Sequence, residues 1–240
     1  MSTRASFIIR KGGIDKELYN HFDGYPSGLG RDVLNLIKTT NVHLLYDLLI
    51  PSADGMDFSA ARFEEAVGKM KPYEYRQLNS LFIQDSLSCE YAYVIDIDDK
   101  KLFFYVGFQH VPQEGNRYGV EGKPCHSGDV YYPCRLSAIF SFSFICATET
   151  AGIVELMEKS KDNSSDDIEI YDVPAAVINV PESLSTPSTE NADNSNTAIL
   201  DSIKTLLLYG PLGPEIINDI ARLNNISVDT VKEVVKRMRV

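Results

Sequence analysis

The sequence predicts an α+β amino-terminal domain with a mostly antiparallel sheet, a flexible acidic linker and a small all-α carboxy-terminal module. Three observations predict this order. Segments of strand and helix character alternate over residues 1–180. Residues 181–197 hold two prolines and three acids but almost no apolar residue, so burial cannot offset the entropy of ordering them. Residues 198–240 show apolar residues at helical spacing in three short runs.

The strand predictions depend on β-branched and aromatic content between turn residues. Residues 5–10 and 16–22 flank a Gly-Gly turn, which indicates a hairpin. Residues 90–108 predict a second hairpin around the polar turn 98–101, and the apolar run 136–147 predicts a buried strand. Residues 168–181 are expected either to form a last strand or to lie on the surface.

The helix predictions depend on apolar spacing and on end signals. Helices are expected over residues 31–40, 41–50, 57–70, 73–85 and 149–161. Pro51 ends the second of these, and Asp57 or Ser59 can cap the third.

Length and composition bound the class of protein. A chain of 240 residues can form one or two domains with a core of useful size. The opening MSTRASFIIRKG lacks the apolar run of a signal peptide, and no stretch approaches the roughly 20 apolar residues of a membrane span. We therefore expect a cytosolic protein with no membrane partner.

The four cysteines would stay reduced in that compartment. Cys125, His126 and Cys134 lie near one another in the sequence, but they lack the close Cys-x2-4-Cys pair that is typical of zinc sites. We therefore expect neither a metal nor a cofactor.

The charge is uneven along the chain. The net charge is −11, and residues 198–240, with six Lys/Arg and five Asp/Glu, are at +1, which leaves −12 for the remainder. A strongly acidic body argues against nucleic-acid binding by the whole surface and favours a basic partner.

In the carboxy-terminal module, the small residue Ala221 is followed four residues on by Asn225 and then by the apolar residues Ile226, Val231 and Val234. This pattern resembles the helix-turn-helix of bacterial transcription regulators, in which Ala221 would take the small-residue position of the first motif helix and Asn225 stands where glycine is usual. The resemblance covers residues 198–240 and implies that the last helix reads DNA.

The residues expected to face DNA are polar or basic and lie on or beyond that last helix: Ser227, Thr230, Lys232, Lys236, Arg237 and Arg239. Asp229 and Glu233 oppose them near the helix start. The alternative is a small three-helix module that binds protein. The acidic body would make DNA affinity modest and dependent on salt unless the chain forms a homodimer.

Residues 1–108 contain three notable stretches: the opening STRA, the segment YNHFDGYPSGLGRDVLNLI with its His-aromatic-Asp-Gly-Tyr-Pro corner, and the later hairpin YAYVIDIDDKKLFFYVG. In these stretches they resemble small proteins encoded by bacteriophages and prophages. Phe22 replaces the more usual tryptophan of that corner. The family has no assigned activity, so the resemblance implies only an accessory protein that acts inside a bacterial cell.

Three interpretations of the corner HFDGYPSGLG remain open. Gly24, Gly28 and Gly30 could leave amides open to an anion beside Arg31, although the spacing matches neither the dinucleotide-binding fingerprint nor the P-loop. His21 and Asp23 share one side of a continued strand and could act in proton transfer or metal binding, if Asp96 and Asp98 lie beside them. The third interpretation is a stiff turn.

In that third interpretation Asp23 caps the turn through a backbone hydrogen bond, Phe22 and Tyr25 pack, and Pro26 stiffens the chain.

The leading functional hypothesis is a non-enzymatic accessory protein whose carboxy-terminal module binds DNA and whose acidic domain binds a protein or small ligand. One alternative is an inhibitor of a host protein, such as a nucleic-acid enzyme of a defence system. The other is a small metal-dependent hydrolase or nucleotide-binding enzyme that uses the His21 and Asp23 corner.

Overall fold

The computed structural model describes residues 3–78, 80–163 and 167–172, together with residues 227–229, 232 and 236. The chain divides into two compact units, Met1–Ala175 and Ala176–Val240. The expected linker, residues 181–197, and most of the expected helix-turn-helix module lie outside the described residues.

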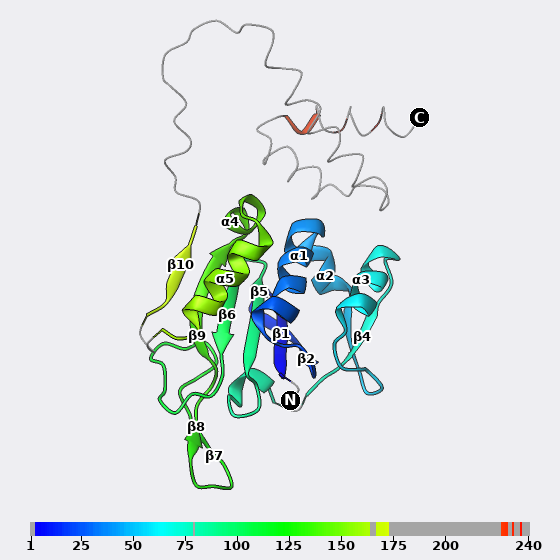
Figure 1. Cartoon of the computed structure of the whole chain (residues 1–240). Helices are drawn as coiled ribbons and strands as arrows, with labels where there is room; N and C mark the ends of the chain where they lie inside the picture. Colours follow the sequence, from blue (N-terminus) through cyan, green and yellow to red (C-terminus); the bar gives the residue numbers. More distant parts are fainter. Residues whose placement is uncertain are drawn as a thin grey trace, which may run out of the picture. The chain divides into compact units, whose positions relative to one another are not determined.

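The first unit is an α+β fold built on a six-stranded mixed sheet with the order β10-β9-β6-β5-β1-β2 (Figure 1). Its β1–β5 and β9–β10 pairs are parallel, and the other three pairs between described strands are antiparallel. The strands are β1 (Ala5–Lys11), β2 (Ile14–Asn20), β5 (Tyr91–Asp96), β6 (Lys101–Val106), β9 (Arg135–Ser141) and β10 (Glu169–Tyr171). Both predicted hairpins, β1–β2 and β5–β6, are confirmed.

The helices pack against one face of this sheet (Figure 1). They are α1 (Arg31–Thr39), α2 (Val42–Leu48), α3 (Ala60–Gly68), α4 (Phe142–Ala147) and α5 (Thr150–Ser160). Helix α1 buries Val33, Leu34, Leu36 and Ile37 in the main core, as its apolar spacing predicts. Among the described residues no helix is both long enough and apolar enough to cross a membrane.

The opposite face of the sheet is covered by loops rather than helices. There Ile8, Val94 and Tyr105 from the sheet belong to a second cluster with Ile83 and Tyr118, which come from connecting segments. A small hairpin, β7 (Lys123–Pro124) and β8 (Val130–Tyr131), lies within one of these connections. Because both faces are covered, the central strands β1 and β5 are apolar at consecutive positions.

The helix predicted over residues 73–85 is wrong. Tyr73–Arg76 is strand β4, which pairs in parallel with β3 (Leu49–Ser52), and Phe82–Gln84 is a single 3-10 turn, η2. The tyrosines of β4 are buried while Glu74 and Arg76 are exposed, which is the two-residue period of a strand.

Two other predicted elements have different ends. The helix expected over residues 41–50 ends at Leu48, where β3 begins. The apolar run 136–147 is half strand and half helix, because the side chain of Ser141 accepts a hydrogen bond from the amide of Phe144 and caps α4.

Glu17 of β2 is buried and holds the covering loop to the sheet. Its carboxylate accepts hydrogen bonds from the Ser6 hydroxyl at 2.5 Å and from the amides of Phe82 at 2.6 Å and Ile83 at 3.1 Å. Burial raises the pKa of Glu17, and the hydrogen bonds offset part of that rise.

This shift predicts a pH dependence of stability. The folded-state pKa of Glu17 lies above the unfolded value of about 4.3, so folding is favoured while this carboxyl is protonated. Its contribution to the free energy of unfolding is complete below the unfolded pKa and is lost as pH rises through the folded-state pKa. The Glu17→Gln variant lacks this dependence. Urea unfolding from pH 4 upward should therefore show the parent chain losing stability relative to the variant, whereas a constant difference would contradict the assignment.

Candidate functional site

The corner, residues 21–30, connects the end of β2 to α1 and is anchored on the sheet. Strand β2 ends at Asn20, and Asp23 adopts a left-handed backbone with φ of 54°. The amide of Gly24 donates to the Thr3 carbonyl oxygen at 2.9 Å, and the Tyr93 hydroxyl of β5 donates to the Gly24 carbonyl oxygen at 3.0 Å. The strand therefore does not continue through His21 and Asp23, so the alternation expected of them is absent.

The glycines of the corner serve close packing. A Cβ atom at Gly28 would lie 2.2 Å from the Asp23 carbonyl oxygen, and one at Gly30 would lie 3.0 Å from the Tyr93 ring. The Gly24 amide donates to the Thr3 carbonyl oxygen, and the amides of Gly28 and Gly30 donate to the Tyr25 carbonyl oxygen at 3.0 and 3.4 Å. The open amides predicted for an anion at these three glycines are therefore not present.

The aromatic side chains of the corner are exposed, so the expectation that Phe22 and Tyr25 pack is wrong. Phe22 is 63% exposed and Tyr25 38%. The His21 ring lies edge-to-face against Phe22, with centroids 4.4 Å apart, and its Nδ1 is hydrogen-bonded to the Tyr19 hydroxyl at 2.7 Å. The Asp23 carboxylate accepts from the Tyr25 hydroxyl at 3.2 Å, where a backbone cap was expected.

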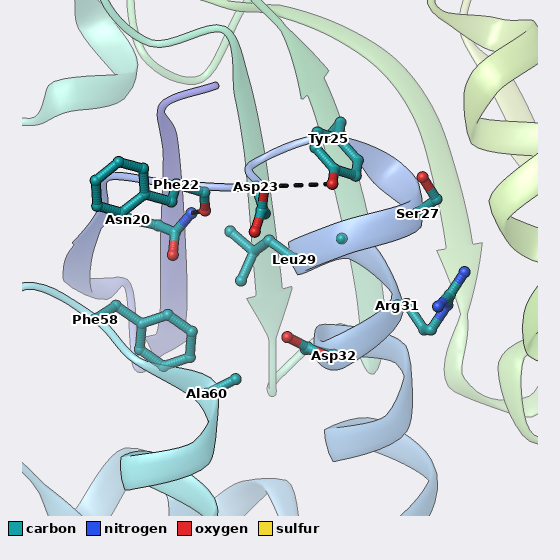
Figure 2. A pocket seen from close by; sticks show the side chains of 11 residues that line it. Asn20, Phe22, Asp23, Tyr25, Ser27, Leu29, Arg31, Asp32, Phe58 and Ala60 are labelled. Carbon is teal, nitrogen blue, oxygen red and sulfur yellow. Dashed lines mark hydrogen bonds between the residues drawn. The ribbon is translucent and has the colours of Figure 1, made fainter. Parts of the chain in front are cut away.

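Two hollows flank Phe22, and Phe58 lines both. The first has a volume of about 310 Å³ and lies between the corner and the start of α3 (Figure 2). Its lining includes the carboxylates Asp23 and Asp32. The second, of about 440 Å³, includes His21, Asp57 and Arg62. Both volumes are at the lower end of the range typical of ligand sites, about 300–1,000 Å³.

The two hollows differ in charge. Asp32 in the first is half-buried and forms no ion pair with a described residue, and burial, followed by the charge of Glu64, raises its pKa. In the second, Asp57 is paired with Arg76 at 2.5 Å, while the Arg62 guanidinium donates to the Met56 sulfur at 3.0 Å. In the first hollow, therefore, Asp32 has no ion-pair partner among the described residues, and Arg31 offsets only part of the rise in its pKa.

Asp96 and Asp98 do not join this site. Asp96 of β5 lies opposite Arg10, near one end of β1. Gly24 of the corner packs against Ala5, which lies at the other end of β1. Five residues of strand separate these ends by about 17 Å. Asp96 is paired with Arg10 and Arg117, and the Asp98 carboxylate accepts from the Gly12 amide at 2.6 Å.

His21 and Asp23 thus lie at one end of the sheet, and Asp96 and Asp98 at the other. Within the described ranges no group of three or more His, Cys, Asp or Glu side chains could hold a metal ion. Cys125 lies on the β7–β8 hairpin, whereas Cys134 is buried and its Sγ donates to the Cys89 carbonyl oxygen at 3.3 Å.

Three of the residues expected to face DNA can be placed. Ser227, Lys232 and Lys236 are exposed, and both lysines are helical, as are Val228 and Asp229. Lys232 lies 3.8 Å from the Asp229 carboxylate. Thr230, Arg237 and Arg239 lie outside the described residues.

Sequence reasoning missed Asp32, Phe58 and Arg62 as lining residues. Asp32 has the ordinary place of an acid in the first turn of a helix, and Phe58 and Arg62 belong to a segment about thirty residues after the corner. No local signal separates them from structural residues. Comparisons of the chain with family models, curated proteins and solved structures found no match.

Proposed function

We propose that this chain is a non-enzymatic accessory protein of the bacteriophage type, with two binding parts. The first unit binds another molecule at the hollow beside Phe22, and the carboxy-terminal module binds DNA. The observation that supports the first part is an exposed aromatic ring between two hollows on a corner whose backbone is fixed by hydrogen bonds. Concave surfaces with a few polar groups around an aromatic residue are typical of binding sites.

Binding fits this corner better than the hydrolase alternative. His21 is engaged with Tyr19, and Asp23 with Tyr25, while Asp96 and Asp98 hold β1 and its turn at the other end of the sheet. A general base needs a reacting group within hydrogen-bond reach and a partner that orients it. The corner supplies a histidine whose Nδ1 is hydrogen-bonded to a tyrosine and not to a carboxylate.

Charge indicates the class of partner for the first unit. Residues 1–175 contain 17 Lys/Arg and 26 Asp/Glu, a net charge of −9. Such a surface attracts basic partners and repels nucleic acid. A basic protein of the host, including a nucleic-acid enzyme that the chain would inhibit, is the partner class that this charge favours.

If the carboxy-terminal module binds DNA, replacing its two exposed lysines should lower the DNA affinity strongly. The double variant Lys232→Glu, Lys236→Glu of the full chain should lose at least about tenfold in DNA affinity, because two phosphate contacts become repulsive. Gel-shift titrations over a salt series measure this loss, and the slope of affinity against salt should become shallower.

The matched control is the double variant Lys100→Glu, Lys123→Glu. It makes the same change in net charge at exposed lysines of the first unit. Equal losses in both double variants would show a general charge effect, and the absence of any DNA affinity in the parent chain at low salt would remove the DNA-binding part of the proposal.

A further inference from the structure

We propose that the first hollow beside Phe22 receives the cationic end of a lysine or arginine side chain from a partner protein. This inference rests on the proposed function of the first unit as a binding module, and it names the chemical group that the hollow accepts.

The carboxylates of the hollow lie on one side of the corner. In Figure 2 Asp23 and Asp32 lie on the same side of the helical turn as Leu29 and Phe58, whereas Arg31 lies on the opposite side of that turn. The only cationic side chain in the lining of this hollow, among the described residues, is therefore turned away from the two acids.

Asp32 has no hydrogen-bond or ion-pair partner among the described residues, although its side chain is half-buried at the start of α1. Burial and then the charge of Glu64 raise its pKa, and the charge of Arg31 offsets only part of that rise. A cation entering the hollow would supply the missing charge and a charge-assisted hydrogen bond.

The other walls suit an aliphatic stem that ends in a cation. Phe22 and Ala60 give apolar surface above the buried Leu29 and Phe58, and the exposed face of Phe22 can hold a cation over its ring. Lysine and arginine bury their methylene stems on apolar surface while the charged end finds a polar partner.

The second hollow does not have this character. Arg62 forms no ion pair with a described residue, and Asp57 is already paired with Arg76. A cation there would meet an uncompensated guanidinium. Phe22 therefore separates a hollow that attracts a cation from one that repels it, and the net charge of −9 over residues 1–175 attracts basic proteins toward both.

The test uses the full chain and three short peptides that differ at one side chain. They carry a central lysine, a central Nε-acetyl-lysine and a central glutamate, with blocked ends and otherwise glycine. Titration followed by NMR should show saturable binding of the lysine peptide, with a Kd on the order of 1 mM, and shifts at residues 22–32. The acetylated and glutamate peptides should not saturate.

The substitution Asp32→Asn should weaken binding of the lysine peptide about tenfold. Asp54→Asn, the same change at an exposed residue outside the hollow, should leave the affinity unchanged. Thermal unfolding of both variants checks that the fold is retained.

Equal binding of the lysine and acetyl-lysine peptides, or full affinity in the Asp32→Asn variant, would overturn the inference. Saturable binding of the glutamate peptide at the corner would also overturn it, yet would leave the first unit a binding module. If none of the three peptides binds and a diamine such as cadaverine does so in an Asp32-dependent way, the occupant is a free amine and the assignment to a protein side chain is wrong.

Discussion

Replacing Asp96 by alanine should lower the free energy of unfolding of the first unit by about 3 kcal/mol. Asp96 is 3% exposed, and its carboxylate lies 3.0 Å from the Arg117 guanidinium and 3.6 Å from that of Arg10. Without the carboxylate, Arg10 keeps only its ion pair with Asp15, Arg117 keeps only the longer contact with Asp99, and the Asp99 amide loses its acceptor. The value is at the low end of the range for a broken buried ion pair because both arginines are about a quarter exposed.

Asp99→Ala is the matched control. Asp99 is 56% exposed and its carboxylate is 3.9 Å from Arg117, so its loss should cost no more than about 1 kcal/mol. Urea unfolding followed by circular dichroism gives both values. Equal costs would show that the carboxylate of Asp96 is not a structural centre of this turn and would reopen a chemical role for it.

The role of Asp96 shows where sequence reasoning succeeds and where it ends. The β5–β6 hairpin was predictable because its two strands and polar turn are adjacent in the chain. The partners of Asp96 were not, because Arg10 reaches it through the parallel β1–β5 pairing and Arg117 through a loop on the far face of the sheet. Parallel pairing joins segments that are distant in sequence, so no local pattern reports it.

The elements that were predicted wrongly have a related cause. In residues 73–85 Tyr73 and Tyr75 have the two-residue spacing of a strand, but this signal covers only four residues. Tyr73–Arg76 forms a strand because β4 pairs with β3, which lies about twenty residues earlier in the chain. Helices α1, α3 and α5 were predictable because each presents its apolar side at helical spacing over two or more turns.

Only the sharp turn of the candidate site was predictable from the sequence. Its glycines and proline indicate a fixed backbone shape, and the structure shows that shape. The exposure of Phe22, and the lack of an ion-pair partner for Asp32 among the residues that the structure describes, depend on what the rest of the fold leaves uncovered. These two properties define the binding hypothesis, and both require the tertiary structure.

Replacing Gly28 by alanine should destabilise the first unit by about 1–3 kcal/mol. The new Cβ would lie 2.2 Å from the Asp23 carbonyl oxygen and 3.1 Å from the Tyr25 ring. The ring can rotate, but the carbonyl oxygen cannot move without weakening the hydrogen bond of 2.8 Å that it accepts from the Leu29 amide. The backbone of the corner must therefore shift.

Replacing Gly68 by alanine should have the opposite effect on the free energy of unfolding. No atom outside its own helix lies within 4 Å of a Cβ at Gly68, at the end of α3, so alanine there should stabilise by up to about 1 kcal/mol through its higher helix propensity. Thermal and urea unfolding of the two variants give the two signs.

Because Gly28 also lines the first hollow, Gly28→Ala should weaken binding of the lysine peptide, whereas Gly68→Ala should not. A stable Gly28→Ala protein with unchanged peptide affinity would mean that the fixed shape of the corner is not what forms the binding site.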